Sequence, residues 1–433
     1  MKSFKKSTIK LMASVNAVIA QFHQLPNKGR VENIVKRVEA MNENEVAISL
    51  KNVMQEFAHR HKNFKELLMD NFNRTEQIHG DLPDFSENKK LLLGAYLTKE
   101  YSFQAAALFN PSIVPHPDQT GLQKGQQRLV MSLRATGEGH ISSIIFKTGI
   151  VDKDGIVSLD ETSGYFSAMK KNDAGNLKIS SAETEKDPGV TNYDLSSPEN
   201  ISLTEKVIFP SAKNESMGME DLRLVKFVDG ENSCYYGTYT AYDGKSIRPM
   251  LLETNDFNSF RVRALYGNAV NDKGMALFPE KINGKFVFCS RQGSEKLSMM
   301  FSDDLYHWDN YQLLREPEFE WEFVQIGNCG SAIKTEKGWL LLTHGVGAMR
   351  KYVISAILLD LHDPTKIIGR LVKPMITAGE GEREGYVPNV VYTCGMLQHG
   401  KLLIIPYAVS DFATVFASVE IDEILNEMKN IAE

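Results

Sequence analysis

The strongest constraint on the fold is the texture of the sequence after about residue 90. Short apolar runs alternate there with turns rich in Gly, Asn and Asp, and no helical pattern lies between them. Examples are RLVMSLRAT, SSIIFKTGIV, LRLVKFV, CYYGTYTAY, KFVFCSR, WLLLTHGV, YVISAILLDL and KLLIIPYAV. Strands this regular predict an all-β barrel, sandwich or propeller.

An internal repeat favours the propeller among these folds. An apolar strand runs into an Asp-bearing turn in LLETNDFNSF, MMFSDDLYHW and ILLDLHDPTKII, which contain Asp256, Asp304 and Asp363. The turns recur at intervals of roughly fifty residues, the length of a four-stranded propeller blade. Asp is also common in hairpin turns for local hydrogen-bonding reasons, so the repeat alone does not fix the architecture.

The first part of the chain has a different pattern. Residues 3 to about 80 contain few glycines and place apolar residues at helical spacing. The PNKG segment at residues 26–29 would separate a first helix from a second, and residues 42–44 would cap a third. We predict an α-helical extension over residues 1–85 and an all-β domain over residues 86–433. The extension is interpreted as a packed appendage, with an oligomerisation arm or a lid as functional alternatives.

Composition and charge exclude several classes of function. The 433 residues are 42% hydrophobic and 24% charged, which suits a large globular core. The formal net charge is −6 and no long run of lysine or arginine occurs, so no nucleic acid partner is expected. Polar residues interrupt the apolar stretch after the basic N-terminus, and no stretch could span a bilayer. We therefore expect neither a signal peptide nor a membrane partner.

The cysteines indicate a reducing compartment. They are dispersed and form no C-x-x-C pair: Cys234, Cys289, Cys329 and Cys394. This spacing argues against a zinc site and suits the reduced thiols of a cytoplasmic protein. Cys234 and Cys289 lie inside apolar strand runs, so we expect them to pack in the core.

The segment SMGMEDLRLVKF is the most informative motif for chemistry. Two adjacent carboxylates, Glu220 and Asp221, and the guanidinium of Arg223 stand where a strand begins. Strand alternation predicts Asp221 and Arg223 on one side and Glu220 on the other, so that Arg223 pairs with Asp221 or with a substrate. Taken alone, such a string is more often a solvated turn than a catalytic motif.

Several other motifs of the sequence resemble the same protein family as this segment does. NDKGMALFPEKINGKFVFCSR resembles a stretch of glycoside hydrolase family 130, in which a similar run follows the E-D-x-R motif. WEFVQIGNCGSAIKTEKGWLLLTHGV, ILLDLHDPTKIIGR and EGYVPNVVYTCG look like later parts of that family, in the same order. The match covers about residues 105–420. The resemblance implies a five-bladed β-propeller that cleaves β-mannosides with inversion, using water or inorganic phosphate and no metal or organic cofactor.

The resemblance also assigns the acid. The aspartate of the E-D-x-R motif, here Asp221, would deliver its proton through a hydroxyl of the mannose. Burial beside Glu220 would raise the pKa of Asp221 and keep its proton, whereas Arg223 would lower it. The sequence leaves open which influence is larger.

Sugar-binding residues are predicted around this acid. Asn110, with Phe109 and Ser112 in LFNPS, lies where the family commonly binds substrate. Alternate tyrosines in CYYGTYTAYDG would offer flat surfaces, although such tyrosines are more often ordinary packing. The predicted sugar-binding residues are Asn110, Arg134, Glu220, Arg223, Tyr242, Asp243 and Asp411, with Tyr236 and Tyr239 as further candidates.

The nucleophile decides between hydrolysis and phosphorolysis. Positions that match the family's phosphate ligands hold Arg134, Lys273, Arg291 and His344. Gln325 stands where phosphorylases commonly carry lysine, and Gly274 where many have asparagine. Losing one charge-assisted contact costs about 1.5–3 kcal/mol, so we expect phosphate binding to be weakened and favour hydrolysis. His344 is interpreted equally well as a strand-end histidine satisfied by backbone groups.

A hydrolase needs a carboxylate to activate water. The candidates from the later part of the chain are Glu322, Glu382, Glu384 and Asp411. Each is also readily explained as a surface or turn acid. Three functions therefore stay open: a β-mannosidase, a β-mannoside phosphorylase that releases mannose 1-phosphate, and a sugar-binding propeller without catalysis. We also expect a homo-oligomer that assembles through the N-terminal helices.

Overall fold

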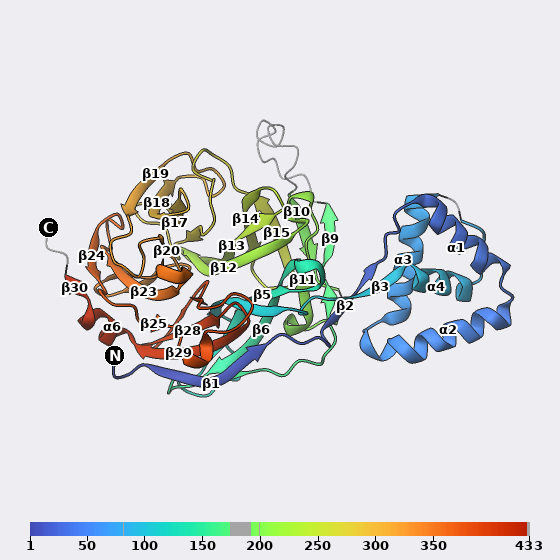
Figure 1. Cartoon of the computed structure of the whole chain (residues 1–433), viewed down its shortest axis with the longest axis horizontal. Coiled ribbons are helices and arrows are strands. Elements are labelled where there is room, and N and C mark those ends of the chain that lie inside the picture. The colour runs from blue at the N-terminus through green and yellow to red at the C-terminus, as the bar shows by residue number, and fades with distance from the viewer. Residues whose placement is uncertain (81, 174–191, 199, 431–433) are drawn as a thin grey trace. The chain divides into compact units, whose positions relative to one another are not determined.

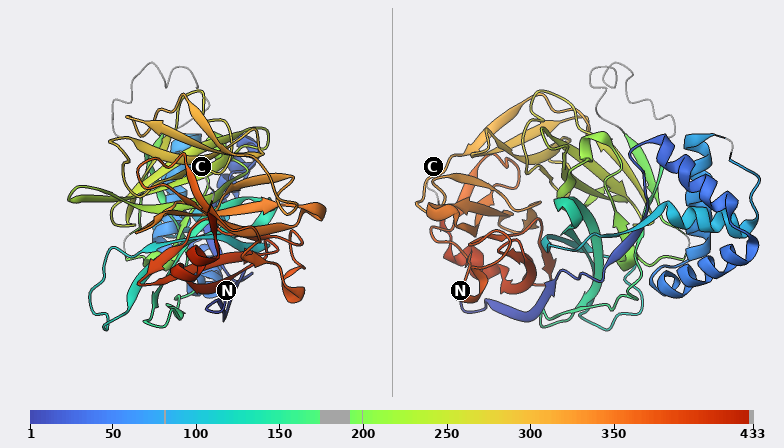
Figure 2. Two further views of the ribbon diagram at one scale, coloured as in Figure 1. Left: turned by 90° about the vertical axis from the view of Figure 1, so that its left-hand side faces the viewer. Right: turned by 45° about the vertical axis from the view of Figure 1, so that its right-hand side comes forward.

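The computed structural model describes residues 1–80, 82–173, 192–198 and 200–430. It divides the chain into two compact units (Figures 1 and 2). The β-rich unit comprises Met1–Ala13, Gln104–Glu161 and Met169–Glu433. The helical unit comprises Ser14–Phe103 and Thr162–Ala168.

Four helices and a strand pair build the helical unit. They are α1 (Lys28–Ala40), α2 (Glu43–Phe57), α3 (Phe64–His79), α4 (Glu87–Tyr96), β2 (Val18–Phe22) and β3 (Thr98–Ser102), with the short β8 (Ser167–Ala168). Asn27 caps α1 by accepting from the backbone N–H of Arg30. Asn42 and Glu45 form a reciprocal capping box at the start of α2. The caps at residues 42–44 are thus confirmed, although they begin the second helix and not the third.

The predicted helix before residue 26 is wrong. The first elements are the strands β1 (Lys5–Met12) and β2. β1 pairs antiparallel with β29 (Ala413–Glu420), at the opposite end of the chain, with Lys5 opposite Ser418. More and less exposed residues alternate along most of β1, as in a strand with one face covered. A partner strand so distant in sequence gives no local signal, which is why this strand was missed.

Four antiparallel sheets form the β-rich unit. The first runs in the order β4-β5-β6-β12-β13-β14-β15-β10-β9, and a single parallel pair, Gly218 with Ser142, joins β6 to β12. The second runs β16-β17-β18-β19, the third β20-β22-β23-β24-β30, and the fourth β1-β29-β28-β26. Figure 1 shows β17–β19 between the first sheet and β23–β24, and β28–β29 beside β1.

The strand bounds follow the predicted apolar runs. In the first sheet they are β4 (Ala107–Pro115), β5 (Gln127–Thr136), β6 (Ser142–Val151), β7 (Val157–Leu159), β9 (Lys170–Asp173), β10 (Tyr193–Ser196), β11 (Lys206–Ile208), β12 (Gly218–Asp229), β13 (Asn232–Tyr242), β14 (Ile247–Thr254) and β15 (Ser259–Ala264). In the second they are β16 (Ala276–Leu277), β17 (Phe286–Gln292), β18 (Lys296–Ser302) and β19 (Tyr311–Arg315). In the others they are β20 (Gln325–Asn328), β21 (Ile333–Thr335), β22 (Gly338–Val346), β23 (Tyr352–Leu359), β24 (Ile367–Arg370), β25 (Ile376–Thr377), β30 (Lys429–Asn430), β26 (Val391–Tyr392), β27 (Leu397–His399) and β28 (Leu402–Val409). The helix α6 (Ile421–Glu427) follows β29.

The core lies between successive sheets. One cluster joins β12–β14 to β16–β18, the next joins β16–β18 to β22–β23, and a third joins β22–β23 to β28–β29. Ala107 and Phe109 of β4 pack on Ala408 of β28. Each sheet therefore buries faces against the sheet before it and the sheet after it.

The structure confirms that the three repeated aspartates stabilise turns. The carboxylate of Asp256 accepts from the backbone N–H of Asn258, and Asp304 and Asp363 bind backbone N–H groups two residues ahead in the same way. All four cysteines are free thiols, and Cys289 lies in the core as expected, while Cys234 is only partly covered. In the part of the chain that the structure describes, no helix combines the length and apolarity needed to cross a membrane.

Candidate active site

Two β-bulges bring Asn110 and Asp221 together. The antiparallel register of β4 shifts around Asn110, and that of β12 shifts around Asp221. Both residues adopt left-handed backbone, with φ of 48° and 57°. A bulge turns a side chain out of strand alternation and so re-aims it. The Nδ2 of Asn110 donates to Oδ1 of Asp221 over 2.7 Å, which places the predicted acid against the first strand of the sheet.

Arg134, on β5, joins both carboxylates of the E-D-x-R motif. Its Nη2 donates to Glu220 Oε1 over 2.9 Å, and its Nη1 donates to Asp221 Oδ1 over 3.3 Å. Its Nε donates to the hydroxyl of Ser142 over 2.8 Å. The prediction that Glu220 and Asp221 face opposite sides of the strand is wrong, because the bulge breaks the alternation on which it rested.

Arg223 and Lys273 complete a group of cations around the two acids. Lys273 Nζ donates to Glu220 Oε2 over 2.6 Å. Arg223 donates from Nη1 to the backbone carbonyl of Asp221 over 2.8 Å and from Nη2 to the hydroxyl of Tyr392 over 2.7 Å. Arg223 therefore supports the backbone of the bulge and makes no direct ion pair with the carboxylate of Asp221.

The surroundings of Asp221 favour its ionised form. Burial would raise its pKa, but the charges of Arg134 and Arg223, the hydrogen bond from Asn110 and the charge of Lys273 together lower it. The cations thus outweigh burial, which settles the balance that the sequence left open. The network therefore stabilises Asp221 as a carboxylate.

Asp411 behaves in the opposite way. It lies in the turn between β28 and β29, with a left-handed φ of 46°. Burial and then the charge of Asp221 raise its pKa to about 7, while Arg134 and Arg350 oppose the shift. One acid of the site is therefore ionised and the other holds a proton up to neutral pH, the division of roles on which acid–base catalysis depends.

Gln325 organises the predicted nucleophile side. With its amide oriented to satisfy both ends, its oxygen accepts from His344 Nε2 over 2.9 Å and from Arg291 Nη1 over 2.5 Å, and its nitrogen donates to the carbonyl of Ser294. Arg291 Nη2 lies 3.7 Å from Asp272 Oδ1. Its Nε is buried and has no hydrogen-bond partner among the described residues. This guanidinium is incompletely satisfied, as expected for a group that binds an anion.

His344 links the two halves of the site while remaining uncharged. Burial first, and then the charges of Arg291 and Arg223, lower its pKa to about 3. Its ring is parallel to that of Tyr352 and meets Tyr392 edge-on, with centroids 4.9 Å apart in the second case. Since Tyr392 also binds Arg223, the acid and the nucleophile side form one network. His344 thus supplies a hydrogen bond and no positive charge.

Glu322 is used by the fold. It is fully buried and forms an ion pair with Arg315. The same carboxylate accepts from the backbone N–H groups of Glu318, over 2.9 Å, and Phe319, over 3.2 Å. Burial raises the pKa of Glu322 although Arg315 opposes the shift.

Glu382 and Glu384 lie in the segment before β26. Both carboxylate oxygens of Glu382 accept from Lys6 Nζ over 2.9 Å. Glu384 is exposed and lines a cavity of about 500 Å³ with Tyr386 and Phe412. In the described part of the chain, no hydrogen bond or ion pair joins Glu322, Glu382 or Glu384 to the cluster around Gln325.

The tyrosines of β13 divide between core and edge. Tyr239 is buried and its hydroxyl donates to Glu215. Tyr236 packs edge-on against Phe227, with ring centroids 5.7 Å apart. Tyr242 is half-buried at the end of the strand. The first two therefore serve packing, the interpretation that strand statistics favoured.

Asp243 closes the turn between β13 and β14. Its Oδ1 accepts from the backbone N–H of Lys245 over 2.8 Å and of Ser246 over 2.7 Å. The bond from Ser246, followed by that from Lys245, lowers the pKa of this exposed carboxyl. The structure gives Asp243 a turn role and no contact with the network around Asp221 within the described residues.

Tyr392, Asp272 and Arg350 belong to the network, and the sequence analysis did not single them out. Tyr392 lies inside a motif that carries the family resemblance, and Asp272 directly precedes Lys273, so both stood beside selected residues. Arg350 follows β22 in a left-handed turn, with φ of 54°, and acts on Asp411. No local pattern could have identified Arg350, because its role depends on a turn of another sheet.

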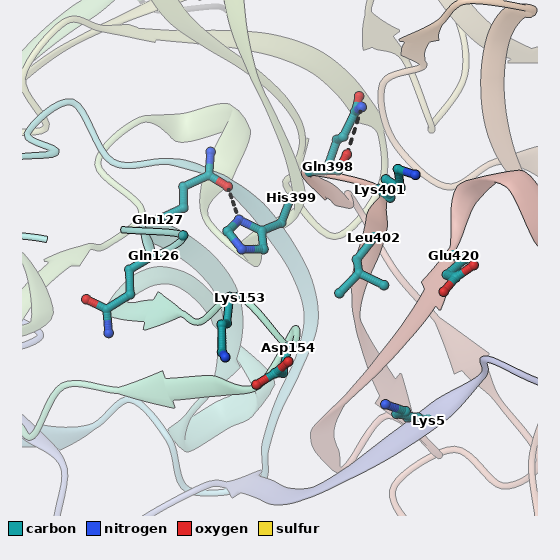
Figure 3. A pocket seen from close by; sticks show the side chains of 12 residues that line it. Lys5, Gln126, Gln127, Lys153, Asp154, Gln398, His399, Lys401, Leu402 and Glu420 are labelled. Carbon is teal, nitrogen blue, oxygen red and sulfur yellow. Dashed lines mark hydrogen bonds between the residues drawn. The ribbon is translucent and has the colours of Figure 1, made fainter. Parts of the chain in front are cut away.

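A second cavity, of about 780 Å³, lies away from these contacts (Figure 3). Its lining includes Lys5, Lys153, Lys401 and Leu402, and His399 bonds to Gln127 at its edge. None of the predicted site residues lines it. Its size therefore does not mark the reaction centre. Across the described residues, no group of three or more His, Cys, Asp or Glu side chains could hold a metal ion.

Comparison with known proteins gives consistent matches. The family model described as beta-1,4-mannooligosaccharide phosphorylase, of glycoside hydrolase family 130, matches residues 183–430. A 1,2-beta-oligomannan phosphorylase of Thermoanaerobacter sp. (strain X514) is 34% identical over 52% of this chain and 75% of that protein. A beta-1,2-mannobiose phosphorylase of Listeria innocua is 31% identical over 53% of this chain and 65% of that protein. The solved complex of the beta-1,2-mannobiose phosphorylase from Listeria innocua superposes with a TM-score of 0.54 and 21% identity, over 74% of this chain and 92% of that one.

Proposed function

The chain belongs to glycoside hydrolase family 130, and we propose that it is a β-mannoside phosphorylase. In this reaction an oxygen of inorganic phosphate attacks the anomeric carbon of the mannosyl group from the face opposite the leaving oxygen. The leaving oxygen receives a proton, and mannose 1-phosphate is released with inverted configuration. Phosphate is a co-substrate, and the proposal includes no metal or organic cofactor.

One observation carries the choice of phosphate over water. The guanidinium of Arg291 has a buried Nε without a hydrogen-bond partner among the described residues, and its nearest carboxylate, Asp272, is 3.7 Å away. Asp272 itself already accepts from the backbone N–H groups of Lys273 and Ser294. Among the described residues, the nucleophile side thus offers an unsatisfied cation and no free base.

The expectation of hydrolysis is accordingly replaced. It rested on Gln325 as the mark of a lost phosphate ligand. In the network, the Gln325 amide oxygen instead accepts hydrogen bonds from Arg291 and His344. A glutamine at this position is therefore compatible with a phosphate site next to Arg291. The relatives that match over half of the chain carry names of phosphorylases, in agreement with this reading.

Asp221 is proposed as the acid, with Asn110, Arg134, Glu220, Arg223 and Asp411 around the sugar. The low pKa of Asp221 in the free protein means that the sugar must change its surroundings before it can donate a proton. A bound sugar that weakens the contacts of Asp221 with Arg134 would do so, and Asp411, which interacts with Asp221 by charge, holds a proton up to about pH 7. The proposal therefore treats the two aspartates as a pair with one proton between them.

We further propose a β-1,2 linkage and a five-bladed propeller. The linkage is supported by the names of the relatives from Thermoanaerobacter and Listeria. The blade count is supported by the sheets, since the first sheet divides at the single pair of Gly218 with Ser142 into two groups, giving five in all. The contact of β4 with β28 fits closure of the ring. Free cysteines fit a cytoplasmic enzyme.

The test is product analysis with and without phosphate. The full chain is incubated with β-1,2-mannobiose and with β-1,4-mannobiose, and mannose and mannose 1-phosphate are quantified. We expect mannose 1-phosphate from the β-1,2-linked substrate only when phosphate is present. Release of mannose alone in phosphate-free buffer would instead support a hydrolase. Binding without any product would favour a non-catalytic sugar-binding protein.

A further inference from the structure

We infer that Lys6, on the N-terminal strand β1, is a positioning residue for Asp411 and acts through Glu382 and Ser410. The contacts that lead from Lys6 to Asp411 do not depend on which reaction the protein catalyses. Only the predicted effect on turnover rests on the proposed function. The inference gives a role to Glu382. Its carboxylate already accepts hydrogen bonds from several donors, so it is not available as a base.

The turn that carries Asp411 needs external support. Ser410 and Asp411 are consecutive residues with left-handed φ, 48° and 46°, and neither is glycine. Such backbone is unfavourable for residues with a Cβ and persists where the surroundings hold it. Ser410 is fully buried, so its polar groups must find partners inside the protein.

The segment from Glu382 to Val390 supplies these partners. The backbone N–H of Ser410 donates to the carbonyl of Val390 over 2.7 Å, and the N–H of Val387 donates to the carbonyl of Ser410 over 3.0 Å. The hydroxyl of Ser410 donates to the carbonyl of Glu382 over 2.7 Å. Gly385 lies so close that a Cβ there would be 2.6 Å from the Ser410 carbonyl oxygen. The segment and the turn therefore form one hydrogen-bonded body.

Glu382 ties this body to β1. Lys6 Nζ donates to both of its carboxylate oxygens over 2.9 Å and lies 5.9 Å from the ring centroid of Tyr407. The hydroxyl of Tyr407, which is buried, donates to the same carboxylate over 3.3 Å, and the N–H of Gly379 donates over 2.9 Å. Four donor contacts fill the carboxylate, so it serves as a link and not as a proton acceptor.

The geometry connects the link to the reaction centre. Asp411 faces the ionised Asp221 and the guanidinium groups of Arg134 and Arg350, all on other elements. Its proton is held by burial and by the charge of Asp221, both of which change steeply with small shifts in position. If Lys6 is removed, the turn gains freedom, and the acid pair loses its spacing.

The experiment compares three variants of the full chain. Lys6→Met removes the charge and keeps the aliphatic stem over Tyr407, Lys6→Arg keeps the charge, and Lys10→Met is the matched control on the exposed face of the same strand. Hydrogen exchange is followed by mass spectrometry in peptides that cover residues 382–390 and 405–413. The kcat, the KM for β-1,2-mannobiose and the pH dependence of kcat/KM are measured beside it.

We expect Lys6→Met to speed exchange in both peptides and to lower kcat by about ten-fold, with KM changed less than about two-fold. The limb of the pH profile near neutrality should shift in this variant alone. Lys6→Arg should restore wild-type behaviour, and Lys10→Met should match wild type throughout. The inference is overturned if Lys6→Met and Lys10→Met show the same exchange and the same pH profile. If the wild-type protein turns over no mannoside, the proposed function fails, and the exchange data still decide the inference.

Discussion

Asn110 and Asp221 lie 111 positions apart, yet the amide of the first donates a 2.7 Å hydrogen bond to the carboxylate of the second. Each occupies a β-bulge and each has left-handed backbone. Asparagine and aspartate tolerate this conformation better than other residues with a Cβ. The site thus lies where two strands leave their regular pairing. The left-handed backbone at these two positions orients Asp221 and Asn110 toward each other.

Replacing Asp221 with Asn tests the acid. The change keeps the size of the side chain and removes its acidic proton, so turnover should fall by about 10²–10⁴-fold. The measurement is the initial rate of mannose 1-phosphate formation, with thermal unfolding as the check on folding. Glu336→Gln, which removes a charge on an exposed turn, is the control. A variant with more than about a tenth of wild-type activity would remove Asp221 from the mechanism.

The raised pKa of Asp411 predicts a pH-dependent cost in stability. The unfolded chain loses this proton near pH 4, and the folded chain keeps it to about pH 7. Stability should therefore fall as the pH rises from about 4 to about 7 and then level off. Asp411→Asn lacks the titration, so it should be more stable than wild type by about 1–3 kcal/mol at pH 8 and by little near pH 4.

Denaturant unfolding at several pH values checks this expectation. The difference in free energy of unfolding between Asp411→Asn and wild type should grow with pH across the stated window. An equal difference at every pH would show that Asp411 titrates normally in the folded protein.

Replacing Arg291 with Lys separates charge from geometry. Lysine keeps the positive charge but loses the planar fork that reaches Gln325 and, in our proposal, phosphate. The KM for phosphate should rise by about ten-fold or more, and the KM for mannobiose should stay within about two-fold. Steady-state kinetics with each substrate varied in turn gives both values. Arg37→Lys on the exposed face of α1 is the control, and a rise in the mannobiose KM alone would place Arg291 on the sugar side.

Assembly through the helices can be tested without damage to β1. Truncation of residues 1–80 would also delete β1, which belongs to the β-rich unit. Since Phe22 of β2 pairs with Thr98 of β3, the residues between them can be replaced by an Asn-Gly turn that closes a hairpin. We expect the full chain to be a homo-oligomer and the shortened chain to be smaller in subunit number. Light scattering gives both masses, and an unchanged subunit number would exclude the helices from the contact.

Much of the site could be anticipated from the sequence because its residues lie in strand-end motifs. Asn110, Arg134, Glu220 and Lys273 were selected from separate segments, and hydrogen bonds join them around Asp221. Strand and turn patterns likewise placed most of the strands. These features depend on neighbouring residues, which a single sequence displays.

The errors concern properties that depend on distant parts of the chain. The alternation of residues along a strand does not reveal a bulge, so Glu220 was assigned to the wrong side of its strand. Glu322 seemed a candidate base because the sequence does not show that the turn after β19 folds its carboxylate back onto Arg315. The neutral state of His344 follows from complete burial beside two arginines, which no local pattern reveals.

The pairing of β1 with β29 also sets the order in which the protein can be completed. The ribosome synthesises Ser418 long after Lys5, so this strand pair cannot form until the residues between them have been made. Until then β1 has no partner strand, and an unpaired strand is open to association with other chains. The helical unit, most of which is the continuous segment Ser14–Phe103, can fold during synthesis. We therefore expect the pairing of β1 with β29 to be the slow, late step of folding and the stage most sensitive to chaperones.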